Sequence, residues 1–286
     1  MKLNNSIAII DVGGTGISVF RSRNEHQHTT SINELLGINN DCAERERRIN
    51  NFLQKTIKVL KLDGVESVIV GIPGPVETSG QVWVECPPLG LRINSIELQN
   101  IGGMVVNDTV CQLMLIDQRH FSSQFDQHSL ITVGTSLGAC LFTPRDLNLS
   151  RLNKARSFEI AHDLVNVSQQ DFLTTKKKST LPFMLPAHRL FSMGGIAYSL
   201  DINTNTSDTG MIEVRQNDLQ SAIRSRKVDK AVLDIWCQSL DGFIRSFYSH
   251  LGVRIKSPLI LRGGITSAFY KSEYEEILSN YFEVSF

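Results

Sequence analysis

The sequence predicts an α/β fold in which two similar halves each contain a glycine-rich β-hairpin. Residues 7–20 read I-A-I-I-D-V-G-G-T-G-I-S-V-F, an apolar run, a Gly-Gly-Thr turn and a second β-branched run, which is a hairpin pattern. Residues 131–142, I-T-V-G-T-S-L-G-A-C-L-F, repeat this strand–turn–strand pattern with one extra residue. Between and after the hairpins, segments with helical periodicity are each followed by a short apolar strand. The repeated hairpin indicates a duplicated unit.

Each hairpin turn has two interpretations, an ordinary tight turn or a site for phosphates. Gly13 and Gly14 let a ligand approach the backbone N–H groups, and Asp11 at the rim could hold a hydrated metal ion. Gly134 and Thr135, with Gly138 after them, could approach the same polyphosphate from a second side. Neither turn is a P-loop, because no G-K-[ST] follows, and neither has the spaced glycines of a dinucleotide turn.

Composition excludes several classes of protein. At 286 residues the chain is long enough for one large domain or two lobes, and its 29 basic residues balance 29 acidic ones. This balance gives no electrostatic case for nucleic acid or for an anionic membrane. The apolar runs are too short to span a bilayer, and no signal peptide is visible. Five scattered cysteines, never in C-x-x-C spacing, argue against disulfides and favour a cytoplasmic protein.

The first half alternates loops, strands and helices. We expect residues 24–31, which are polar, to form a solvated loop, and residues 41–62 to form an amphipathic helix. A strand over 67–72 runs into G-I-P-G-P at 71–75, a stiff turn that is either a connector or a wall of a ligand cleft. Residues 82–91 pass through a strand into a second proline-stiffened loop.

Asp108 lies where a strand over 104–107 meets an apolar helix that we expect to begin at Thr109 and to end around Arg119-His120. One interpretation is helix capping, which aspartate does well. The other is a catalytic base, because ligand sites of α/β proteins gather at strand ends.

The second half contains S-F-E-I-A-H-D at 157–163, where Glu159 and His162 would face the same way on a helix or tight turn. Alone, such a pair is more often part of a polar surface. Residues 169–186 read as a surface loop and 226–251 as a long helix. A strand over 258–261 then turns at Gly263-Gly264 into a final helix that ends near Tyr281.

The order of these motifs resembles the ROK family (repressor, open reading frame, kinase) of the actin and hexokinase group. The series is D-V-G-G-T, G-I-P-G-P, V-V-N-D, T-V-G-T-S-L-G, E-I-A-H and L-R-G-G-I. The resemblance implies a duplicated, ribonuclease H-like α/β fold with two lobes and a cleft between them. It places the first phosphate motif in residues 1–108, and the second phosphate motif and the adenosine motif in 109–286.

The resemblance also implies a role for each matching residue. Asp108 matches the catalytic base, and Asn107 matches a residue that binds a sugar hydroxyl; Glu159 and His162 match sugar-site residues of E-x-G-H. We expect Gly74, in the rigid turn, to line the same site. The remaining matches concern the nucleotide: Asp11 (with Mg²⁺ held through water), Gly13, Gly14, Thr15, Gly134, Thr135, Gly138, Gly263 and Gly264. The implied cofactors are ATP and Mg²⁺, and the implied partner is a sugar or polyol.

The sugar side of the pattern departs from the family. Residues 168–195 contain no cysteine, so the cluster that binds structural zinc in most members is missing and no zinc is expected. The family's sugar-binding glutamate falls near His188, and Ala161 replaces the glycine of E-x-G-H. Pro88 stands where glucose-phosphorylating members have an asparagine, and the chain ends before the family's closing helix. These changes predict another polyol, weak binding of glucose-like sugars, or loss of catalysis.

Four functions remain open. The first is an ATP- and Mg²⁺-dependent, glucokinase-like sugar kinase, supported by Asp108, Asp11 and both phosphate turns. The second is a non-catalytic sugar- or nucleotide-binding relative. A repressor is disfavoured, since family repressors carry a helix-turn-helix ahead of the first hairpin and six residues precede Ile7. A polyphosphate-using kinase is the fourth, with Lys176–Lys178 as the basic run for a long anion. Relatives are often dimers, so a homodimer is also open.

Overall fold

The computed structural model describes residues 7–14, 16–22, 25–37, 41–74, 76, 82–86, 89–116, 124–134, 136–166, 184–200, 202, 205–206, 212–213, 216–225 and 228–285. The chain divides into two compact units, residues 1–118 with 145–157 and residues 119–144 with 158–286. The expected boundary at residue 108 falls inside the first unit. No helix in the described part of the chain is both long enough and apolar enough to cross a membrane.

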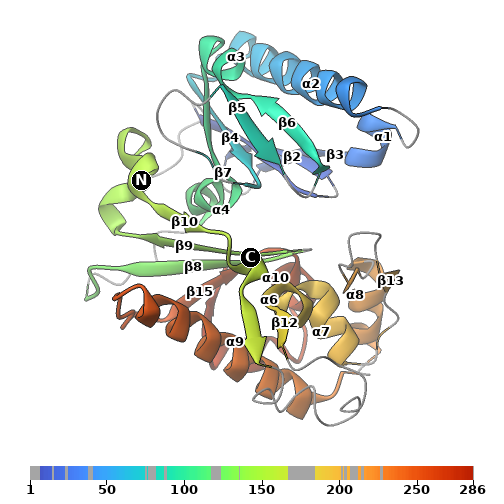
Figure 1. Ribbon diagram of the computed structural model, residues 1–286, viewed down its shortest axis with the longest axis vertical. Helices are drawn as coiled ribbons and strands as arrows, with labels where there is room; N and C mark the ends of the chain where they lie inside the picture. The colour runs from blue at the N-terminus through green and yellow to red at the C-terminus, as the bar shows by residue number, and fades with distance from the viewer. Residues whose placement is uncertain are drawn as a thin grey trace. The chain divides into compact units, whose positions relative to one another are not determined.

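The first unit is a five-stranded sheet in the order β3-β2-β1-β4-β7 with helices on its faces (Figure 1). β1 and β2 form the predicted antiparallel hairpin, whereas β1, β4 and β7 are parallel neighbours. A two-stranded sheet, β5-β6, adds to the unit. The elements are β1 Ile7–Val12, β2 Gly16–Ser22, β3 Glu25–Ser31, α1 Ile32–Leu36, α2 Cys42–Leu62, β4 Ser67–Ile72, β5 Trp83–Cys86, β6 Leu91–Asn94, α3 Ser95–Asn100, β7 Gly103–Asn107, α4 Asp108–Gln112 and the 3₁₀ helices η2 Leu113–Leu115 and η5 Leu149–Lys154.

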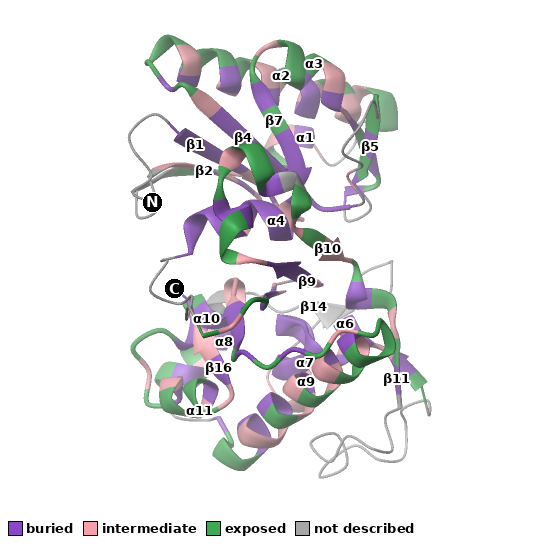
Figure 2. Ribbon diagram, turned by 90° about the vertical axis from the view of Figure 1, so that its left-hand side faces the viewer, coloured by how far each residue is buried: buried purple, intermediate pink, exposed green. Residues whose placement is uncertain are grey.

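The side chains of β1 alternate between the two faces of this sheet, and this alternation shows which face α2 covers and which face α4 covers. Ala8, Ile10 and Val12 of β1 pack in one core with the apolar stripe of α2, while the outer face of α2 is exposed (Figure 2). Because successive side chains of a strand point to opposite faces, Ile9 and Asp11 lie on the other face. That is the face on which α4 packs, since Asp11 is hydrogen-bonded to Gln112.

The second unit repeats this arrangement in the order β10-β9-β8-β15-β16. β8 and β9 form the second predicted hairpin, and β8, β15 and β16 are parallel neighbours, with Arg262 opposite Thr132. The two sheets therefore share one topology, as a duplication predicts. The elements are β8 His128–Val133, β9 Leu137–Phe142, β10 Arg156–Phe158, the 3₁₀ helix η6 Ile160–His162, β11 Leu164–Asn166, β12 Met184–Pro186, α6 Ala187–Phe191, α7 Met193–Ser199, β13 Asn205–Thr206, β14 Ile212–Glu213, α8 Gln216–Arg224, α9 Lys230–His250, β15 Leu259–Arg262, α10 Gly264–Phe269, α11 Glu275–Ser279 and β16 Phe282–Val284. The 3₁₀ helix η4, Pro144–Leu147, belongs to the first unit from Arg145 onward.

Four expectations about single elements were wrong. Residues 184–186, expected to lie in a surface loop with 169–183, form the strand β12, which pairs antiparallel with β11; residues 169–183 lie outside the described part of the chain. Residues 25–31 are not a loop but the edge strand β3, which pairs antiparallel with β2. The helix after Asp108 is shorter than expected, because α4 ends at Gln112 and a 3₁₀ turn follows. The final helix is broken into α10 and α11, with Lys271 at φ 55° between them, and β16 follows as a further parallel strand.

Candidate functional site

Three parallel strands of the first unit bring the predicted site residues to one edge of its sheet. Asp11 lies opposite Gly71 in the register of β1 and β4, and Ile72 lies opposite Asn107 in the register of β4 and β7. Asp11 and Asn107 are thus at the carboxyl ends of strands separated by β4 alone. The carboxyl edge of a parallel sheet is where α/β proteins bind ligands.

Asn107 connects the turn after β4 to the start of α4. Its Nδ2 donates to the carbonyl oxygen of Gly74 at 3.0 Å, and its Oδ1 accepts from the N–H of Thr109 at 3.0 Å as the N-cap of the helix. Asn107 is 4% exposed. Asn107 therefore holds the G-I-P-G turn against α4, and its contact with a sugar hydroxyl stays a prediction.

Asp108 is the first residue of α4 and is partly buried. Its Oδ1 shares the N–H of Thr109 with the cap, at 2.8 Å. The capping interpretation and the catalytic interpretation are therefore compatible, since Asn107 is the N-cap and Asp108 stands one residue inside the helix. The geometry places the Asp108 carboxylate at the edge of the sheet that carries Asp11, and its role as a base stays a prediction.

α4 lies against the ends of β1 and β4 because Gly71 has no side chain. A Cβ at Gly71 would lie 2.5 Å from the Cβ of Cys111 and 3.2 Å from the Cα of Asp108. One turn beyond Asp108, Gln112 Nε2 donates to Asp11 Oδ2 at 2.6 Å. Burial chiefly, and then the negative charges of Asp11 and Asp108, raise the pKa of the Cys111 thiol well above its usual value. Both carboxylates thus lie near one buried, neutral thiol.

The two glycine turns are closed by their own backbone. The N–H of Gly13 donates to the carbonyl of Gly16 at 2.8 Å, and that of Gly134 donates to the carbonyl of Ser136 at 3.0 Å. Gly14 is partly exposed, and Gly138 pairs with Thr132 across the second hairpin. Thr15 and Thr135 lie outside the residues that the structure describes, as do Pro75, Pro88 and Lys176–Lys178.

Two other segments, residues 192–195 and Gly263-Gly264, meet at the second turn. The carbonyl of Gly134 accepts from the N–H of Met193 at 2.9 Å, and a Cβ at Gly263 would lie 2.6 Å from the carbonyl oxygen of Val133. A Cβ at Gly264 would meet the sulfur of Met193. The segments that match the second phosphate motif and the adenosine motif are therefore adjacent, and their roles stay predictions. The S-M-G-G stretch that completes the group, residues 192–195, was missed, although its paired glycines were a visible signal.

The E-I-A-H turn is supported by a histidine from α6. Glu159 and His162 are exposed at the two ends of η6. His188 is buried, its Nδ1 lies 2.8 Å from the carbonyl oxygen of Ala161, and its ring packs edge-on against that of His162 at 5.4 Å. Burial chiefly lowers the pKa of His188. Among the described residues no three His, Cys, Asp or Glu side chains gather as metal ligands.

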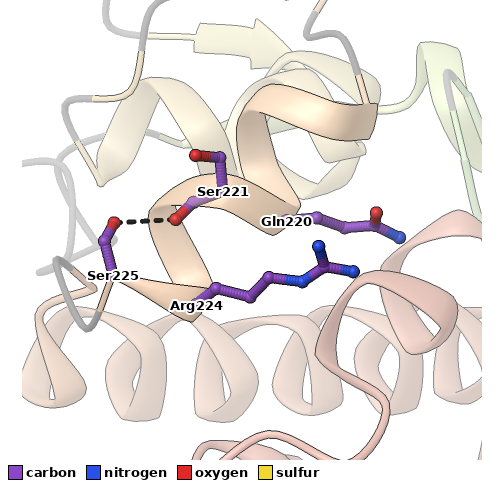
Figure 3. Close-up of a pocket in the computed structure, with 4 residues that line it drawn as sticks. All are labelled: Gln220, Ser221, Arg224 and Ser225. Atoms are coloured by element: carbon purple, nitrogen blue, oxygen red, sulfur yellow. Dashed lines mark hydrogen bonds between the residues drawn. The ribbon is translucent and has the colours of Figure 1, made fainter.

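Two hollows flank α8 in the second unit. One, of about 470 Å³, lies between α8 and the segment from α10 to Glu273, and its polar lining includes Arg224, Ser267 and Lys271. The other, of about 400 Å³, is lined by Gln220, Ser221, Arg224 and Ser225. Gln220 and Arg224, one helical turn apart, extend side by side between them (Figure 3). The larger hollow begins one turn along α10 from Gly264.

Comparisons with known proteins show similarity at the level of structure. No protein-family model matches the sequence, and no curated protein matches it significantly. A ROK family glucokinase from Streptomyces griseus, solved with glucose and AMPPNP, matches 96% of this chain and 87% of its own at 15% identity and a TM-score of 0.53. An inorganic polyphosphate/ATP-glucomannokinase from Arthrobacter matches 99% and 92% at 13% identity and a TM-score of 0.53.

A regulator is among the similar structures as well. A ROK family transcriptional regulator, a homologue of the E. coli MLC protein, matches 98% of this chain and 73% of its own at 14% identity and a TM-score of 0.53. At these identities the similarity establishes the fold and not the activity. The resemblance seen in the motifs is confirmed at that level: the chain has the two-lobed α/β fold of the ROK family sugar kinases.

Proposed function

We propose that this protein is an ATP-dependent kinase that phosphorylates a hydroxyl group of a sugar or a related polyol. The observation that carries the proposal is the pair of carboxylates at one sheet edge of the first unit, Asp108 at the start of α4 and Asp11 at the end of β1, joined through Gln112. Phosphoryl transfer needs alignment and charge stabilisation more than covalent chemistry, and this edge offers both a base and a carboxylate for a cation.

Asp108 would take the proton of the acceptor hydroxyl. Its Oδ1 is oriented by the N–H of Thr109, and the cap at Asn107 fixes the helix that carries it. Exposed Glu159 and His162 would bind further hydroxyl groups of the acceptor. The family's glutamate falls near His188, whose imidazole has no carboxylate to offer a sugar hydroxyl and lies against the carbonyl oxygen of Ala161. This supports an acceptor other than an ordinary glucose substrate.

The second unit would bind the nucleotide. The phosphates would meet the turn at Gly134 and Gly138, and the adenosine would lie beside Gly263-Gly264, where the 470 Å³ hollow begins. Asp11 would hold Mg²⁺ through water. A single carboxylate with phosphate oxygens suits this ion, which keeps several waters and rarely uses an all-protein cage. Bound there, Mg²⁺ would neutralise charge on the phosphate oxygens.

The test is a coupled assay of ADP release over hexoses, amino sugars and cyclitols, with Asp108→Asn as the matched variant. A general base typically contributes about 10²–10⁴ in rate, so Asp108→Asn should fold, bind acceptor and lose at least about 99% of turnover. A parallel screen that detects the phosphorylated acceptor itself, run with ATP or with polyphosphate, distinguishes the donors, because transfer from polyphosphate releases no ADP. Turnover in the variant at the wild-type rate would remove Asp108 from the role of base.

A non-catalytic binding protein is the second candidate. It is favoured by the altered sugar side, where His188 replaces a carboxylate, and by the similarity to a ROK family regulator. Acceptors or nucleotides that raise the thermal midpoint without any turnover would support this candidate over the kinase.

A further inference from the structure

Gln112 makes a polar contact that the motifs of this chain do not predict. Its Nε2 donates to Asp11 Oδ2 at 2.6 Å, across 101 positions of sequence, and the contact is partly buried. A hydrogen bond to an ionised carboxylate is shorter and stronger than one between neutral groups. A glutamine amide on an ordinary helix surface would instead be solvated, so this contact fixes one orientation of the Asp11 carboxylate.

The position of Gln112 on α4 ties Asp11 to Asp108. Residues four apart lie on the same face of a helix, so Asp108 and Gln112 project from α4 on one side. The helix is held in place, because Gly71 packs against Cys111 near its C-terminal end and Asn107 caps its first turn. The spacing between the two carboxylates is thus determined by one short, anchored helix.

The chemistry of the donor matters as much as its place. Lysine or arginine would also hold Asp11, but would cancel its negative charge and its attraction for a cation. The glutamine amide is neutral, so it orients the carboxylate and leaves the charge in place. Donors of this kind behind a metal-binding side chain commonly contribute 10- to 100-fold in metal affinity.

We infer that Gln112 is a positioning residue that holds Asp11 ready for a hydrated divalent cation and sets its distance from Asp108. The inference rests on the proposed function for the role of Asp11. It assigns no contact between Gln112 and the substrates, and it concerns the metal-dependent part of nucleotide binding.

The experiment compares wild type with Gln112→Met, which keeps the length of the side chain and removes the donor. Calorimetry measures the affinity for AMPPNP with Mg²⁺ and with EDTA. Gln112→Met should lower the Mg²⁺-dependent gain in affinity by about 10- to 100-fold and leave the EDTA value unchanged. Gln54→Met is the matched control, because Gln54 Nε2 also donates to a carboxylate, Glu97 Oε2, at 2.6 Å on the exposed side of α2.

A double-mutant cycle separates positioning from a general loss of stability. In the Asp11→Asn background, Gln112→Met should cause no further loss of the Mg²⁺-dependent gain, since the group through which it acts is already neutral. Additive losses of the Mg²⁺-dependent gain in the double variant would overturn the inference. So would a Gln112→Met variant with the same Mg²⁺-dependent gain as wild type, or a wild type whose affinity for AMPPNP does not depend on Mg²⁺. The two proposals can fail separately. If the wild type turns over no acceptor but the double-mutant cycle gives the predicted result, the proposed kinase activity is refuted and the positioning role of Gln112 is supported.

Discussion

Replacing Gly71 with alanine tests whether close packing of α4 on β4 holds the candidate site together. The added Cβ would lie 2.5 Å from the Cβ of Cys111, 2.8 Å from its sulfur and 3.2 Å from the Cα of Asp108. Carbon atoms in contact normally lie about 3.5–4.0 Å apart, so α4 would have to move by about 1 Å. Overpacking of this kind typically costs about 1–3 kcal/mol. The same shift would move Asp108 away from Asp11.

Scanning calorimetry measures the first consequence. At roughly 2–4 °C per kcal/mol, the thermal midpoint of Gly71→Ala should fall by about 2–12 °C. Gly242→Ala is the control, because nothing lies within 4 Å of a Cβ there and alanine in the interior of α9 should stabilise by about 0.5–1 kcal/mol. Adding Cys111→Gly removes both crowded atoms, so the double variant should be more stable than the sum of the single changes predicts.

The second consequence is catalytic. A misplacement of about 1 Å can cost on the order of 10² in rate, so turnover of Gly71→Ala should fall on every acceptor that the wild type uses. A variant that melts within about 1 °C of wild type would refute the packing argument, whatever its activity.

Two further predictions concern the second unit. Burial lowers the pKa of His188, so the unfolded chain binds a proton more readily than the folded chain, and stability should fall as the pH drops below about 6.5. In thermal melts between neutral pH and about pH 5, the drop in the thermal midpoint should be smaller for His188→Asn than for wild type. Equal drops would contradict this origin. Gly263→Ala combines φ 114° with a Cβ 2.6 Å from the carbonyl oxygen of Val133 and should cost about 2 kcal/mol or more, whereas Gly134→Ala in the same group has open space and should melt close to wild type.

The parts of the fold that the sequence predicted correctly are those with strong local patterns. The hairpins expected at 7–20 and 131–142 were predicted because apolar runs flank glycines, and the structure has them as β1-β2 and β8-β9. α2 was predicted because Ile49, Leu53 and Ile57 recur on one face. The edge strand β3 was missed because its residues are polar and only its pairing with β2 makes it a strand. The last helix was overextended because Lys271 adopts a left-handed backbone that its side chain does not signal.

The candidate site divides in the same way. Asp11, Asn107 and Asp108 stood at strand ends that local patterns predict, so their common edge followed from the parallel sheet. Gln112 and Met193 act through contacts between segments far apart in sequence, and a single sequence carries no sign of such contacts. The tie from His188 to Ala161 was missed for the same reason, although His188 had been singled out as a departure from the family pattern.

The two sheets share a topology but not a charge. At the end of β1, the first copy has a carboxylate, Asp11, opposite a glycine; at the matching place on β8, the second copy has Thr132 opposite Arg262. At these matching places one sheet thus carries a carboxylate and the other a guanidinium group. An acidic edge attracts a cation or accepts a proton, and a basic edge lowers the electrostatic cost of an approaching anion.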